Sequence, residues 1–185
     1  MSSDPPRRQR RSLRPERLLP FACIAAALAL LASEFMTTFE LTGADLPSSN
    51  TPCTLEAASR HHFALGVLAI FAVVATVVAV MAGSRPAAIG VAVAGVLAVL
   101  LFLVIDLPDA NSVGTLPDSC TTEPGSLLDG KALPRAGFWL ELVGSVALAL
   151  SGLILATLTP PQLAALRPRA LGGPRDSARR SRPAD

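Results

Sequence analysis

The sequence predicts an all-α membrane protein, a transmembrane four-helix bundle with two long outer loops. Hydrophobic residues make up 51% of the 185 residues. They form four apolar runs instead of recurring at a helix or strand period between polar positions. Each run holds roughly 20 residues, the length that a helix needs to cross a bilayer. Lipid offers no partner to backbone polar groups, so runs of this length without alternation are helical.

The positions of the runs define the domain organisation. We expect four transmembrane helices, over about residues 18–38, 62–83, 86–106 and 137–158. Together they make one transmembrane domain, residues 18–158. The flanking segments 1–17 and 159–185 are rich in arginine, proline and serine. Because they offer little to bury, both are expected to be basic, disordered cytoplasmic tails.

The first run follows a basic segment, which is also typical of a secretory signal. The string Arg10-Arg11-Ser12-Leu13-Arg14 faintly resembles a twin-arginine signal. However, Glu34 follows Ser33 without a clean small-x-small cleavage site, and no lipoprotein box precedes Cys23. We therefore expect the first helix to be retained, with cleavage as the alternative.

The connections between the runs differ in length. The inner turn Gly83-Ser84-Arg85 is minimal, whereas the outer loops cover about residues 39–61 and 107–136. Long loops without a regular pattern often bind partners. Both loops contain Asp-Leu-Pro-x-x-Asn, at Asp45–Asn50 and Asp106–Asn111. Either an old duplication or chance similarity in a biased sequence explains this repeat.

Basic residues lie mainly on one side of the predicted membrane and set the orientation. Thirteen arginines flank the runs on the side of the tails and the inner turn, against three basic residues in the outer loops. Since basic flanks stay in the cytoplasm, both termini are predicted to be cytoplasmic in a multi-pass protein of the cell membrane. With four acids inside and ten outside, the formal charge is +9 inside and −7 outside.

The tail arginines are predicted to face the lipid bilayer. The candidates for contact with anionic lipid headgroups are Arg7, Arg8, Arg10, Arg11, Arg179 and Arg180. A role as topology determinants alone is the simpler alternative. Nucleic acid is not an expected partner, because the tails contain no aromatic residue on which bases could stack.

Three cysteines are sorted by this topology. Cys23 lies in the first run and is expected to be a small buried hydrophobic residue. Cys53 and Cys120 lie one in each outer loop, in an oxidising compartment, and are predicted to form a disulfide. Pairing between two chains is the alternative. No Cys-x-x-Cys pair is present, which argues against a thiol oxidoreductase.

Titratable residues gather near the outer ends of the runs. Glu34 and Glu141 are expected about one turn inside the outer boundary, with Asp106 and His62 at its edge and His61 beside them. Carboxylates in a membrane segment are costly and usually face the bundle interior. These five residues are therefore the candidate ion or metal ligands, and helical spacing predicts that Glu34, His62, Asp106 and Glu141 converge beneath the outer loops.

Three explanations stay open for this group. Carboxylates and imidazoles are suitable ligands for a divalent metal, the one cofactor that the sequence suggests. The same groups could pass protons, because histidine titrates near neutrality. The third explanation is structural: residues near the interface pair with Arg60, Arg135 or Lys131, or cap helix ends.

A resemblance adds to the predicted architecture. The Asp-Leu-Pro turns and the stretch Gly137-Phe138-Trp139-Leu140-Glu141-Leu142-Val143-Gly144 resemble uncharacterised small four-span integral membrane proteins of high-GC actinobacteria. The 15 arginines against one lysine fit that source. The resemblance covers mainly the third and fourth helices and implies a four-span fold with no particular activity. Claudin-like proteins share that plan, but their paired first-loop cysteines and Trp-Gly-Leu-Trp string are missing.

No catalytic motif is present in the sequence. It contains no phosphate loop, dinucleotide fingerprint, serine elbow or His-Glu-x-x-His string, so we predict that the protein is not an enzyme. We expect a non-enzymatic membrane component that binds a partner protein or a lipid through its outer loops, with a partner membrane protein or a homo-oligomer as its assembly. The rival expectation is a small protein that handles protons, ions or a divalent metal with Glu34, His62, Asp106 and Glu141.

Overall fold

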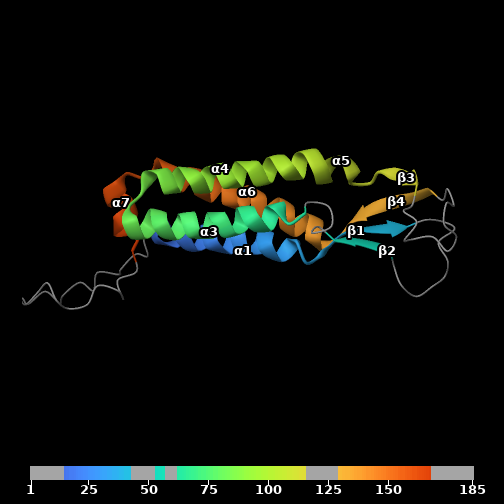
Figure 1. Cartoon of the computed structure of the whole chain (residues 1–185), viewed down its shortest axis with the longest axis horizontal. Coiled ribbons are helices and arrows are strands. Elements are labelled where there is room, and N and C mark those ends of the chain that lie inside the picture. The colour runs from blue at the N-terminus through green and yellow to red at the C-terminus, as the bar shows by residue number, and fades with distance from the viewer. Residues whose placement is uncertain (1–14, 43–52, 57–61, 116–128, 168–185) are drawn as a thin grey trace, which may run out of the picture.

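The computed structural model describes residues 15–42, 53–56, 62–115 and 129–167. The molecule is elongated, with long helices side by side and a small sheet that extends one end (Figure 1). The helices are α1 (Leu19–Ser33), α3 (Ala64–Ala82), α4 (Arg85–Leu101) and α6 (Ala136–Thr157). The molecule is therefore mostly helical, as predicted.

Three helical stretches are long and apolar enough to cross a membrane. They are Ala64–Ala82, Arg85–Asp109 and Ala136–Thr157. The second stretch contains α4, a π-helix (Phe102–Asp106) and α5 (Leu107–Asp109). α1 is equally apolar but shorter, and a 3-10 helix (Pro15–Leu18) precedes it. The prediction of apolar helices of membrane-spanning length is confirmed for these three stretches.

The all-α prediction is incomplete, because parts of both outer loops form one antiparallel sheet. Its order is β2-β1-β4-β3. The strands are β1 (Thr37–Thr42), β2 (Cys53–Glu56), β3 (Val113–Thr115) and β4 (Asp129–Pro134). In the centre, Glu40 of β1 lies opposite Thr54 of β2 on one side and Leu133 of β4 on the other. The β1–β4 pair therefore joins the first outer loop to the second.

Two boundaries differ from the prediction. The first helix ends at Ser33 instead of 38, because Thr37, Thr38 and Phe39 suit a strand and pair with the rest of the sheet. At the other end of the chain, α7 (Pro160–Ala165) lies in a segment that we expected to be disordered. Leu163 of α7 is fully buried against the helices, which explains why this part of the tail is ordered.

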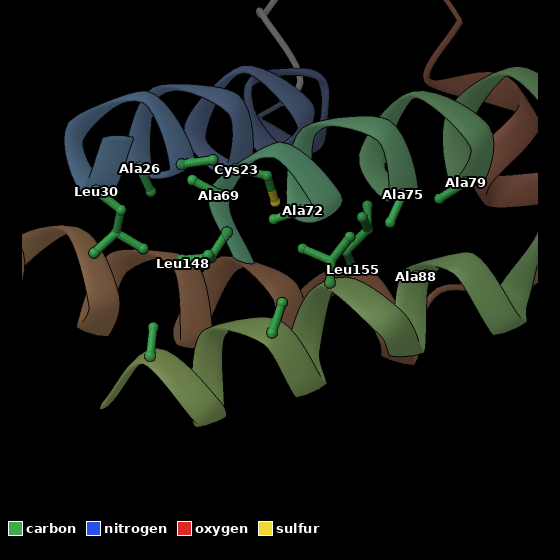
Figure 2. Packing of buried hydrophobic residues seen from close by; sticks show 14 of the residues in the cluster. Cys23, Ala26, Leu30, Ala69, Ala72, Ala75, Ala79, Ala88, Leu148 and Leu155 are labelled. Atoms are coloured by element: carbon green, nitrogen blue, oxygen red, sulfur yellow. The ribbon is translucent and has the colours of Figure 1, made fainter. Parts of the chain in front are cut away.

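The interior of the helices is built from small side chains. Figure 2 shows Cys23, Ala69 and Ala72 facing the interior, with Leu148 on the facing helix. α4 and α6 approach most closely: a Cβ on Gly95 would lie 2.5 Å from the Cα of Ala149. Small residues permit this approach of two helix backbones, which in a membrane is a main source of helix association.

Candidate functional site

The three carboxylates predicted at the outer helix ends are all fully buried. Glu34, Asp106 and Glu141 each have 0% exposed surface. Glu34 directly follows α1, Asp106 ends the π-helix, and Glu141 lies in the second turn of α6. Their burial agrees with the expectation that these residues face the interior of the bundle. All three lie at the end of the helices that adjoins the sheet.

His62 does not join the buried acids. It is exposed, and its φ of 50° lies in the left-handed region, as does that of Phe63. α3 consequently begins at Ala64 instead of 62, so His62 precedes the helix and does not lie on its buried face. His61 lies outside the described residues.

Glu141 is level with Glu34 along the bundle. A Cβ on Gly144 would lie 3.3 Å from the backbone nitrogen of Leu30 in α1, and a Cβ on Gly137 would lie 2.7 Å from a carbonyl oxygen at the start of β1. Glu141 lies between these glycines on the same face of α6. It therefore faces the stretch of chain between Leu30 and β1, which contains Glu34.

Asp106 lies about one turn nearer the sheet than Glu141. α4 and α6 are antiparallel, and Gly95 contacts the backbone of Ala149. Eleven residues from this contact toward the sheet, counted forward in α4 and backward in α6, Asp106 is about level with Phe138. Phe138 is three residues before Glu141.

Glu34 caps a helix other than its own. Its Oε1 accepts a hydrogen bond of 2.9 Å from the backbone N–H of Gly66, in the first turn of α3. Such N–H groups have no partner within their helix, and Phe63 at the N-cap position supplies no side-chain bond. Glu34 therefore ties the end of α1 to the start of α3. Its second oxygen, Oε2, is buried and makes no hydrogen bond to the described residues.

A β-bulge turns Thr38 inward. Thr37 lies opposite Glu56 and Phe39 opposite Leu55, so Thr38 has no opposite residue in β2. Both Thr38 and Phe39 are fully buried, whereas a regular strand would alternate. The Thr38 hydroxyl makes no hydrogen bond to the described residues. Sequence reasoning missed Thr38, because the bulge depends on the register with β2 and no local pattern marks it.

The π-helix is a second irregularity at this end of the bundle. It starts at Phe102, whose ring centroid lies 4.9 Å from that of Phe138, and Phe138 in turn lies 5.6 Å from Phe39. These rings and Ala132 form a small apolar cluster between the helices and the sheet. π-helices and β-bulges are both frequent at functional sites, so this end is the candidate site.

Basic side chains do not share the burial of the acids. The described basic side chains are all exposed: Arg17, His62, Arg85, Lys131, Arg135 and Arg167. Arg135 forms an ion pair with Glu40, on the surface of the sheet. The predicted alternative partner Arg60 lies outside the described residues.

The described part of the chain contains no group of three potential metal ligands. Within residues 15–42, 53–56, 62–115 and 129–167, no three His, Cys, Asp or Glu side chains come close enough to hold a metal ion. Glu34, Asp106 and Glu141 are thus at similar depth without forming a three-carboxylate metal site. Because His61 lies outside the described residues, a metal site that includes it stays a prediction.

Other predicted site residues also fall outside what the structure describes. Cys53 is described by its backbone, which lies opposite Leu41 in the sheet, and Cys120 is outside the described residues. Their disulfide therefore stays a prediction, whereas Cys23 is a buried free thiol, as expected. The predicted lipid-facing residues also lie outside the described ranges: Arg7, Arg8, Arg10, Arg11, Arg179 and Arg180.

Comparison with known proteins gives no match. The chain matches no family model, no curated protein and no solved structure. The resemblance to four-span actinobacterial proteins therefore stays an expectation.

Proposed function

We propose that the chain is an integral protein of the cell membrane, in which α1, α3, α4 and α6 form a transmembrane four-helix bundle. The length of α1 is compatible with a fourth span. Its 15 residues rise about 22 Å, and the preceding four-residue 3-10 helix adds about 8 Å. The sum is about 30 Å, the thickness of the hydrocarbon core.

Exposed side chains at the two ends of the bundle support the proposed placement and orientation. Phe35, Phe63 and Trp139 are more than half exposed at the sheet end, as in an aromatic belt at a membrane interface. Arg85 and Arg167 are exposed at the opposite end. By the positive-inside rule we assign that end to the cytoplasm, so the proposed orientation has both termini in the cytoplasm and the sheet on the outer side.

The functional proposal is based on the sheet. Two loops far apart in the sequence combine through β1 and β4 into one module, and Gly137 seats the start of β1 directly on α6. Loops that only connect helices do not need to pair with each other in a sheet. We therefore assign the protein a non-enzymatic role, in which the sheet binds a partner protein or a lipid on the outer side of the membrane.

Photo-cross-linking from the sheet in intact cells tests this role. A photoreactive amino acid is placed at the exposed positions Thr54, Val113 or Lys131, with Val78 on the exposed face of α3 as the matched control. We expect an adduct of one defined mass, protein or lipid, from the sheet positions and not from Val78. If the sheet positions give only the adducts that Val78 gives, the partner-binding role is wrong.

The burial of Glu34, Asp106 and Glu141 favours a second candidate, the handling of protons or other cations. Buried carboxylates inside a membrane protein are costly and are kept mainly for function. We expect proteoliposomes of the wild-type chain to show a proton or cation flux that Glu141→Gln reduces at least tenfold, with Lys131→Gln unchanged. Metal analysis of the purified protein checks for a bound divalent ion. If the wild-type chain gives no more flux than empty liposomes, or if Glu141→Gln and Lys131→Gln give the same flux, this candidate is wrong.

A further inference from the structure

Three exposed arginines come from three separate elements at the end of the bundle away from the sheet. Arg17 lies in the 3-10 helix before α1, Arg85 is the first residue of α4, and Arg167 follows α7. Figure 1 shows the start of α1, the α3–α4 turn and α7 at the same end of the molecule. The fold therefore brings basic residues that are far apart in the sequence to the same end of the molecule.

α7 holds Arg167 beside the α3–α4 turn. Leu163 anchors α7 in the helical core, and a Cβ on Gly83 in the turn would lie 3.1 Å from a backbone oxygen at the start of α7. The Nε of Arg167 donates a 3.3 Å hydrogen bond to the carbonyl of Val80, near the end of α3, while the side chain stays exposed. Arg85 lies two residues after Gly83, on the other side of the same turn.

These arginines lie at the depth of lipid headgroups in the proposed orientation. The 19 residues of α3 rise about 28 Å from the aromatic residues at the sheet end to this turn. Guanidinium groups match phosphate oxygens in geometry and charge. Exposed Met81 and Ile89 flank the turn on the bundle side and offer an apolar surface to acyl chains, which a free phosphate would not use.

The charge of the whole inner side adds to the attraction. Ten further arginines lie in the sequence of the two tails. The predicted inner side thus has thirteen arginines and only four acids. Basic residues close to the membrane surface attract the anionic lipids of the cytoplasmic leaflet.

We propose that Arg17, Arg85 and Arg167 form a binding site for the phosphate headgroup of an anionic phospholipid in the inner leaflet. This site goes beyond the outer-side role of the sheet, and it rests on the proposed membrane orientation. Of the two arginines at the turn, Arg167 is held by its bond to Val80, so it meets the headgroup with less loss of side-chain freedom than an unanchored arginine.

The test uses the purified full-length chain in an uncharged detergent. Binding of short-chain phosphatidylglycerol is followed by native mass spectrometry and by the rise in thermal unfolding temperature, with phosphatidylcholine and inorganic phosphate in parallel. We expect phosphatidylglycerol alone to bind and stabilise. Each change of Arg17, Arg85 or Arg167 to Gln is expected to weaken binding about fivefold. Arg85→Lys, which keeps the charge, is expected to weaken it less than Arg85→Gln.

Lys131→Gln is the matched control, because it removes one exposed positive charge at the sheet end and is expected to leave binding unchanged. The proposal is wrong if phosphatidylcholine binds equally well, if inorganic phosphate competes fully, or if the three Arg→Gln variants bind like Lys131→Gln. Membrane insertion is measured separately by resistance to alkaline extraction. A variant that inserts normally but no longer binds the lipid therefore tests the site alone, and a wild-type chain that fails to insert overturns the proposed transmembrane bundle, on which the orientation depends.

Discussion

Replacing Gly95 with alanine is expected to destabilise the protein by about 2–3 kcal/mol. The new Cβ would lie 2.5 Å from both the Cα and the backbone nitrogen of Ala149, distances that no side-chain rotation can relieve. α4 and α6 would have to move apart along their contact, which loses van der Waals contacts that lipid does not replace. Thermal unfolding of the purified protein in detergent, followed by circular dichroism, measures the loss.

Gly90→Ala on the same helix is the control. A Cβ there would lie 3.4 Å from the Cζ of Phe71, the far end of a side chain that can turn aside. Alanine is also the better helix former by roughly 0.8–1 kcal/mol, so we expect unchanged or slightly higher stability. Equal stability of the Gly95 and Gly90 variants would contradict the close packing of α4 on α6.

The helices could be predicted from the sequence because lipid imposes a simple requirement. A spanning segment must be apolar over about 20 residues and must satisfy its own backbone, and both conditions can be read locally. The predicted 137–158 and the observed Ala136–Thr157 agree closely. The first helix is the exception, because the predicted run of 18–38 includes Thr37 and Thr38, which form the start of a strand in the sheet.

The sheet could not be predicted because its decisive pairing is not local. β1 and β4 are separated by more than 80 residues, and each is only six residues long. Strand formation there depends on the helices, which bring the two loops to the same end of the bundle. The bulge at Thr38 depends on the register of β1 with β2, so no local pattern in the sequence predicts the inward position of its hydroxyl.

The candidate site was predicted in part. The cost of a charge in lipid correctly suggested that Glu34, Asp106 and Glu141 are buried. The expected start of the second helix at His62 was wrong, because His62 and Phe63 have left-handed φ angles and α3 begins at Ala64. The hydrogen bond from Gly66 to Glu34 was not foreseen either, since it needs the contact between α1 and α3. It fits the structural alternative, in which these residues cap helix ends.

Substitution of Glu34 separates that structural role from a role for its charge. We expect Glu34→Ala to lower the free energy of unfolding by about 3 kcal/mol, because it leaves the buried N–H of Gly66 without an acceptor and empties a packed position. Glu34→Gln keeps a carbonyl oxygen for the same bond, so the loss is expected to be less than half as large. Chemical denaturation of both variants in detergent micelles gives the comparison.

The glutamine variant then decides what the second oxygen of Glu34 is for. That oxygen makes no hydrogen bond to the described residues, so a purely structural Glu34 gains little from its negative charge. If Glu34→Gln folds with near wild-type stability and leaves flux in proteoliposomes unchanged, capping of α3 is its whole role. If the same stable variant abolishes flux, the carboxylate serves cation handling as well. A glutamine variant as unstable as the alanine variant would show that the charge, and not the bond to Gly66, stabilises this end of the bundle.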